Sequence, residues 1–167
     1  MMTNNFAFEA DIAAKKIHIT REFNAPVEKV WKAWTDPELL EKWWSPKPNV
    51  AKTEVMDFTV GGIWKFAMVT ATGAKHWLCA RFTDIEPGKL IATTAVFCDA
   101  DGNVVGGESK WHRDTKFKAI EDNRTKVEID ITFEDEATIK MFAEGFFKQG
   151  TEISYNQLDE LIDQSKL

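Results

Sequence analysis

The polar side chains best placed for chemistry lie in segments that read as strands. Arg81 and Arg113 are candidates for binding a carboxylate or polarising a carbonyl, because a guanidinium can donate two parallel N–H bonds. His112, Glu54 and Asp57 are candidates for moving a proton beside such an arginine. His112 and Arg113 are adjacent in an alternating segment, so only one of them can point inward. The alternative for each residue is a solvated position on the outer face of a sheet.

The sequence contains no recognisable motif for a metal or a nucleophile. The three histidines lack metal-ligand spacing, and the HExxH and Cys-x-x-Cys patterns are absent. No serine stands in a nucleophile elbow, and Gly61-Gly62 lacks the spacing and the lysine of a phosphate loop. Cys79 and Cys98 lie in apolar strand patterns, where small buried hydrophobic residues are expected. We therefore predict no metal site and no cofactor.

Composition places the chain among ordinary globular domains. It has 167 residues, of which 44% are hydrophobic and 29% charged, and a formal net charge of −6. A nucleic-acid-binding face would need clustered basic residues, which the sequence lacks. No apolar stretch is long enough to span a membrane, and the N-terminus does not resemble a signal peptide. We expect one cytoplasmic domain over residues 1–167, with its core in residues 15–162.

Two short helices are predicted after a first strand. Pro26 and Pro37 each suit the first position of a helix, where a missing N–H costs nothing. The apolar residues of the first helix recur at helical spacing, at Val27, Val30, Trp31 and Trp34. The second helix presents an apolar face made by Leu39, Leu40, Trp43 and Trp44. Asp36 is the candidate N-cap of the second helix. Both helices are too short to be stable alone, so they must pack on something larger.

Residues 50–133 read as consecutive strands joined by turns. Alternation of apolar and polar residues is clearest over residues 125–133. Gly61-Gly62 predicts a tight hairpin, and residues 99–103 together with Gly106-Gly107 predict a longer loop. Such an order indicates an antiparallel sheet of about six or seven strands.

Residues 135–163 predict one long helix, about 40 Å at about 1.5 Å per residue, laid across the sheet. Gly145 and Gly150 interrupt it, each at a cost of about 1 kcal/mol relative to alanine. They indicate either close packing against the sheet or room for a ligand. Ser154 and Gln157 fall within the apolar arc of the helix. They would either bond nearby backbone or supply polar contacts in an apolar cavity.

This order of elements resembles the helix-grip fold of the START and birch-pollen-allergen superfamily. Residues 21–43 carry the pattern Arg-x-Phe-x-Ala-Pro-x-x-x-Val-Trp-x-Ala-Trp-Thr-Asp-Pro-x-x-Leu-x-x-Trp. This pattern resembles the family named for homology to the activator of a heat-shock protein's ATPase. Residues 60–66, Val-Gly-Gly-x-Trp-x-Phe, are similar to that family too. The resemblance covers nearly the whole chain.

The resemblance implies an α+β fold in which a curved antiparallel sheet wraps around the final helix, with a ligand cavity between them. It implies binding of a small hydrophobic or amphipathic ligand, without demonstrated chemistry. Two alternatives stay open: a cyclase or dehydratase acting in the same cavity, and a co-chaperone-like module that binds a chaperone. A homodimer is compatible with all three of these readings.

The aromatic residues suit a lining for an apolar ligand with one polar end. The chain has 12 Phe and 7 Trp but one Tyr, so such a lining would carry few hydroxyl groups. Ordinary core packing is the alternative for each aromatic residue. The predicted lining residues are Trp64, Phe66, Met68, Trp77, Arg81, Trp111, Arg113, Phe142, Phe146, Gly150, Ser154 and Gln157.

Overall fold

The computed structural model describes residues 5–105 and 109–167, which form one sheet and four helices. The elements follow in the order β1 (Ala7–Asp11), β2 (Lys16–Phe23), α1 (Val27–Thr35), α2 (Pro37–Trp43), β3 (Val50–Met56), β4 (Ile63–Val69), β5 (Lys75–Glu86), β6 (Leu90–Cys98), β7 (Trp111–Glu121), β8 (Arg124–Phe133), α3 (Glu136–Glu144) and α4 (Phe147–Asp163). Of the predicted longer loop, Gly106-Gly107 lies outside the described residues.

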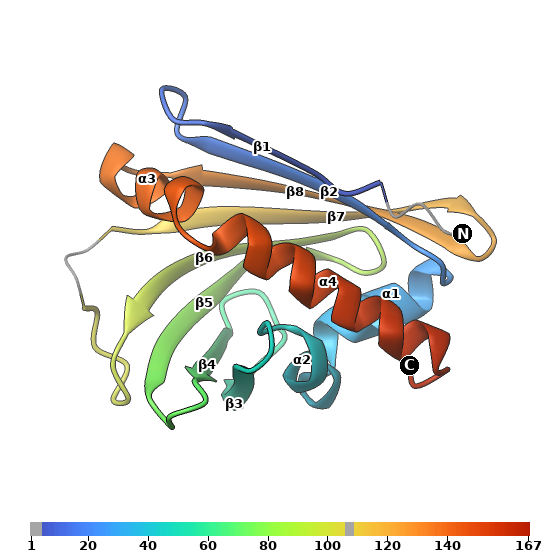
Figure 1. Cartoon of the computed structure of the whole chain (residues 1–167), viewed down its shortest axis with the longest axis horizontal. Helices are drawn as coiled ribbons and strands as arrows, with labels where there is room; N and C mark the ends of the chain where they lie inside the picture. Colours follow the sequence, from blue (N-terminus) through green and yellow to red (C-terminus); the bar gives the residue numbers. More distant parts are fainter. Residues whose placement is uncertain (1–4, 106–108) are drawn as a thin grey trace.

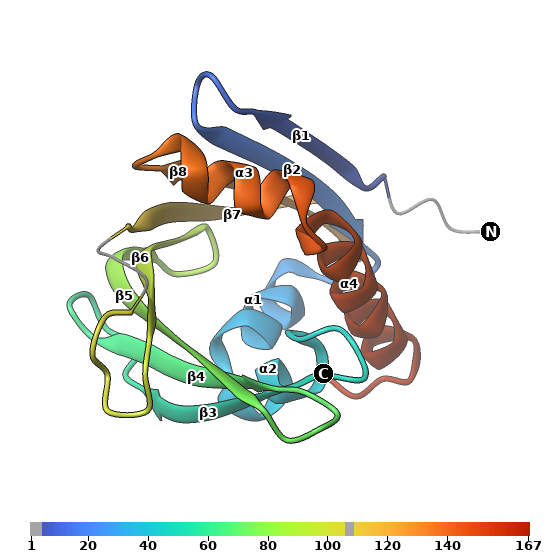
Figure 2. The same cartoon turned by 60° about the vertical axis from the view of Figure 1, so that its left-hand side comes forward.

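The strands form a single antiparallel sheet in the order β1-β2-β8-β7-β6-β5-β4-β3. The sheet curls so that its two edge strands, β1 and β3, lie at opposite ends of the curve (Figure 2). Helix α4 crosses the inner side of the sheet, and α1 and α2 lie beneath α4 (Figure 1). This is the predicted α+β helix-grip arrangement. None of the described helices is long and apolar enough to cross a membrane.

The sheet has eight strands rather than the predicted six or seven, because β1 pairs with β2 at the N-terminal edge. Most of β1 is exposed, so its sequence shows little of the alternation that marks a half-buried strand. One residue that anchors it is Phe8, whose ring meets Phe147 of α4 at a centroid distance of 5.9 Å.

The predicted tight hairpin at Gly61-Gly62 is part of a longer connection between β3 and β4, which spans residues 57–62. Gly61 has the expected positive φ, +90°, but Gly62 does not. Gly62 is needed for a different reason, because a Cβ there would lie 2.2 Å from the carbonyl oxygen of Asp57. The two glycines therefore serve a turn and a close backbone approach respectively.

The two short helices form as their proline and capping residues predict. The Asp36 side chain accepts a hydrogen bond from the N–H of Glu38 at 2.9 Å, and Pro37 follows at the first helical position. The Trp43 ring packs against Trp34 of α1 at 4.5 Å between centroids. Its Nε1 donates to the Ala33 carbonyl at 3.0 Å. These contacts join the two helices into one unit.

The predicted single C-terminal helix is wrong, because it breaks into α3 and α4 at Gly145. Gly145 has an extended conformation, with φ −91° and ψ −153°. A Cβ at this position would lie 2.7 Å from the Met141 carbonyl oxygen, so the break needs a residue without a side chain. Gly145 therefore does not merely weaken a continuous helix but ends α3, and α4 begins after it.

Helix α4 is fastened to β2 by a buried arginine. The Arg21 side chain is fully buried, and it forms an ion pair with Asp159 and a 2.9 Å hydrogen bond to the Asn156 side chain. A buried cation is stable when a carboxylate offsets its lost hydration. This pair therefore fixes the distance between the helix and the sheet at one end of the molecule.

Candidate functional site

A cavity of about 480 Å³ lies between the inner face of the sheet and the two C-terminal helices. Its volume falls within the range of small-molecule sites, about 300–1,000 Å³. The wall is mainly aromatic, with rings from the helices, from the turns that flank them and from four of the strands. These rings belong to Trp34, Trp43, Trp44, Trp64, Phe66, Trp77, Phe82, Phe97, Trp111, Phe142, Phe146, Phe147 and Tyr155.

Strand β4 builds one wall of the cavity through simple alternation. Trp64, Phe66 and Met68 all line the cavity because successive side chains of a strand point to opposite faces. The Trp64 and Phe66 rings stack at a centroid distance of 4.1 Å, and Trp64 Nε1 donates to Thr53 Oγ1 at 3.0 Å. Trp44 then meets Trp64 edge-on at 5.0 Å.

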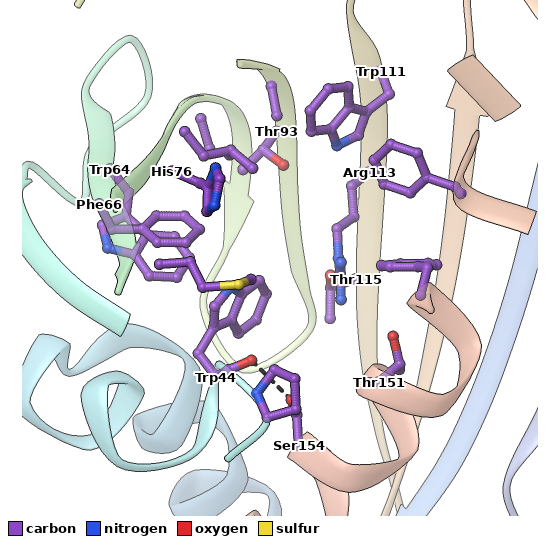
Figure 3. Close-up of a pocket in the computed structure, with 18 of the residues that line it drawn as sticks. Trp44, Trp64, Phe66, His76, Thr93, Trp111, Arg113, Thr115, Thr151 and Ser154 are labelled. Atoms are coloured by element: carbon purple, nitrogen blue, oxygen red, sulfur yellow. Dashed lines mark hydrogen bonds between the residues drawn. The ribbon is translucent and has the colours of Figure 1, made fainter. Parts of the chain in front are cut away.

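Helix α4 holds the segment that carries Trp44. Ser154 Oγ donates to the Trp44 carbonyl at 2.9 Å, drawn as the dashed line in Figure 3. The Gln157 amide donates to two main-chain carbonyls of residues 43–47, at 3.1 and 2.8 Å, and accepts a main-chain N–H at 2.8 Å. Gln157 does not line the cavity, so its predicted place in the lining is wrong. Its amide groups are used by the backbone instead.

Arg113 brings a positive charge into the cavity from β7. Figure 3 shows it between Trp111 and Thr115, facing the space that Trp44 borders on the other side. Its guanidinium carbon lies 5.0 Å from the centroid of the Trp44 ring, a cation–π contact. Its Nη2 donates to the Tyr155 hydroxyl at 3.3 Å. Its Nε is buried and has no hydrogen-bond partner among the described residues.

Tyr155 supplies a buried hydroxyl from α4. The side chain is 2% exposed. Burial raises the pKa of the Tyr155 phenol, and the nearby Arg113 charge offsets only part of that rise. The phenol therefore stays protonated at neutral pH, so that its oxygen accepts from Arg113 while its own hydrogen can be donated.

Apart from Gln157 and Arg81, all of the predicted lining residues form part of the cavity wall. Arg81 is exposed, and its Nη1 donates to the Gly61 carbonyl at 2.7 Å. Its neighbours Ala80 and Phe82 take the inward positions of β5, which leaves Arg81 on the outer face. That these wall residues bind a ligand stays a prediction.

The predicted proton-moving residues do not gather around the cavity. His112 lies on the outer face, where its Nδ1 is 2.7 Å from Thr94 Oγ1. Glu54 pairs with Lys65 at 3.1 Å, and Asp57 accepts a hydrogen bond from a hydroxyl within the β3–β4 turn. Alternation correctly leaves one of His112 and Arg113 facing inward, and the structure places Arg113 there.

Several wall residues were not predicted as lining. Thr115 was detectable, since it lies two residues after Arg113 on the same strand face. Thr93 and His76 gave no signal, because their strands alternate weakly. Trp44 and Tyr155 line the cavity only because the helices dock in this orientation.

Outside the cavity, the two cysteines lie close together. Their sulfur atoms are 3.4 Å apart across β5 and β6. Burial raises the pKa of the Cys98 thiol to about 12. Among the described residues, no cluster of three or more histidine, cysteine or acidic side chains could hold a metal ion.

Comparison with known proteins points to one family. A family model described as Activator of Hsp90 ATPase homolog 1-like protein matches residues 24–163. No curated protein matches the chain.

Solved bacterial structures share its fold. A solution structure of a protein from Arthrobacter aurescens is 32% identical, covers 97% of this chain and 93% of that chain, and gives a TM-score of 0.87. A crystal structure of protein Ms6760 from Mycobacterium smegmatis is 24% identical, with coverage of 93% and 94% and a TM-score of 0.84. The second likeness bears on the fold alone.

Proposed function

The chain belongs to the family of Activator of Hsp90 ATPase homolog 1-like proteins, and on this basis we propose that it binds a small hydrophobic or amphipathic ligand in the cavity between its sheet and C-terminal helices. At the coarse level, the family and the fold are those of a ligand-binding helix-grip domain. The place and the chemistry of binding are the finer part of the proposal.

The observation that carries the proposal is the cavity itself, about 480 Å³ surrounded by aromatic rings. Protein interiors pack as densely as organic crystals and leave few voids larger than a water molecule. Large rings such as those of Trp64, Trp111 and Phe142 would normally pack against one another in a core, but here they surround an open space. An apolar molecule in the cavity would bury that surface, at about 25 cal/mol per Å².

Titration with 1-aminoanthracene, a small apolar fluorophore, tests the proposal. The native protein should bind it with one-to-one stoichiometry and enhanced emission. Thr93→Trp places a large ring in the cavity and should weaken binding by at least about tenfold, because the ring removes apolar volume that the fluorophore needs.

Thr94→Trp is the matched control, because Thr94 is the next residue of β6 and faces the outer side, where it contacts His112. It should leave the affinity unchanged. Equal affinities in both variants, with circular dichroism showing intact folds, would mean that the fluorophore binds elsewhere.

The description of the family supports a second candidate, contact with a chaperone. If this candidate is right, the protein should raise ATP turnover by Hsp90 in a steady-state assay, and Thr93→Trp should retain that effect. Unchanged turnover across a wide protein concentration range would remove this candidate and leave the first untouched.

A further inference from the structure

Arg113 is a partly buried cation whose Nε is fully buried, and its surroundings differ from those of three other cations of the described residues. Those others lie beside a carboxylate, in the pairs Arg21–Asp159, Lys65–Glu54 and Arg124–Glu22. Arg113 forms no ion pair with any carboxylate of the described residues. A guanidinium stays charged at every physiological pH, so burying its Nε in an apolar wall without a partner is costly unless an anion is available.

The contacts of Arg113 leave most of its donors unused. Of its five N–H groups, one is committed to the Tyr155 hydroxyl, at the long distance of 3.3 Å. The Trp44 ring covers one face of the guanidinium but takes no hydrogen bond from its edge. The Trp44 ring and the Tyr155 hydroxyl therefore hold the side chain in the cavity, while the remaining N–H groups of the planar guanidinium are available to bind a ligand.

The residues around the Arg113 guanidinium suit an anionic group of a ligand. Thr115 lies two residues along β7 on the same face, and the Tyr155 phenol keeps its proton because burial raises its pKa. Both hydroxyl groups can donate to an anion that Arg113 binds. The rest of the wall is apolar, so the body of such a ligand would lie against rings such as Trp44 and Trp64.

We propose that the cavity selects amphipathic ligands that carry a single carboxylate, with Arg113 binding the carboxylate and the aromatic wall binding the apolar body. This inference rests on the proposed function. A carboxylate matches the planar fork with two oxygens and balances one positive charge. A dianionic phosphate would leave a second negative charge unpaired in the same apolar surroundings.

Displacement of 1-aminoanthracene by three ten-carbon competitors tests the proposal: decanoate and decyl phosphate, each below its micelle concentration, and decan-1-ol below its solubility limit. Native protein should bind decanoate at least about tenfold more tightly than decanol, since a hydrogen bond to a charged group is stronger than one to a neutral group. Decyl phosphate should bind more weakly than decanoate.

Arg113→Met should weaken decanoate binding by about 10- to 100-fold and change decanol binding by less than about threefold. Arg81→Met is the control, because it removes an arginine from the outer face of the same sheet and leaves the cavity wall intact. It should leave all three affinities unchanged.

The outcomes separate the two proposals. Equal binding of decanoate and decanol by native protein would overturn the carboxylate assignment while leaving the cavity as a binding site. Tighter binding of decyl phosphate would assign the anion to a phosphate instead. Failure of the native protein to bind 1-aminoanthracene or any competitor would overturn the proposed function itself. The comparison within native protein decides the matter even if Arg113→Met does not fold.

Discussion

Replacing Arg21 by methionine should destabilise the protein in a way that depends on pH. The Arg21 side chain is fully buried, and the side chain of its partner Asp159 is 30% exposed. Removing one member of a buried ion pair costs about 3–5 kcal/mol, because the other charge is left without compensation. Since Asp159 retains some contact with water, we expect Arg21→Met to lower the free energy of unfolding by about 2–3 kcal/mol at pH 7.

The sign of the pH dependence follows from Asp159. Burial raises the pKa of its carboxyl, and the Arg21 guanidinium offsets part of that rise. Without Arg21 the folded-state pKa rises further above the unfolded value. The penalty is then absent where the carboxyl is protonated in both states, and it grows as the pH rises through and above the ordinary range of aspartate, about 4.

Urea unfolding followed by tryptophan fluorescence, at pH 7 and at about pH 4, measures both effects. The loss caused by Arg21→Met should shrink to less than about 1 kcal/mol at the lower pH. The double variant Arg21→Met/Asp159→Asn should recover most of the loss at pH 7, because no charge is then left unpaired. Lys126→Met, which breaks the exposed pair with Glu128, should cost less than about 0.5 kcal/mol. An equal loss for Arg21→Met at both pH values would refute the reasoning.

Three further changes test other parts of the structure. Tyr155→Phe removes the buried phenol and should weaken decanoate binding by about three- to tenfold without affecting decanol, measured by the same displacement titration. Gly145→Ala would bring a Cβ to 2.7 Å from the Met141 carbonyl oxygen and should lower the free energy of unfolding in urea by about 1–3 kcal/mol. A thiol pKa of about 12 leaves little thiolate, so mass spectrometry should find Cys98 unmodified by iodoacetamide at pH 8 in native protein and alkylated in urea. Rapid labelling of native Cys98 would contradict that last expectation.

The order of the elements was predictable because local signals agree with the tertiary fold. The proline positions and the Asp36 cap locate the two short helices, and the alternation over residues 125–133 predicts β8. β1 was missed because its residues are mostly exposed, so burial does not impose a pattern on them. The break at Gly145 was missed because propensity gives only the cost of glycine in a helix, whereas the close approach of the Met141 carbonyl exists only in the folded chain.

The candidate site was predictable to the extent that strand alternation determines direction. Trp64, Phe66 and Met68 line the cavity as their spacing predicts. Alternation alone cannot say which of two opposite faces is the inner one, and this is why Arg81 was assigned to the cavity although it lies outside. Gln157 was assigned to the cavity from its helical position, but its amide bonds the backbone of residues 43–47, a segment 110 or more residues earlier in the chain. Such a partner follows from docking, which no local pattern encodes.

The Trp44 ring lies between Arg113 and Trp64, and this position makes the protein an optical reporter of its own cavity. Indole emission responds to nearby charge and to the polarity of its surroundings. An anion that binds the guanidinium would change the electric field at Trp44, whereas a neutral apolar molecule would change mainly the polarity around the ring. Intrinsic fluorescence would therefore distinguish a ligand bound at Arg113 from one bound only against the aromatic wall, without an added label. Trp44→Phe would show whether the Trp44 ring carries the signal.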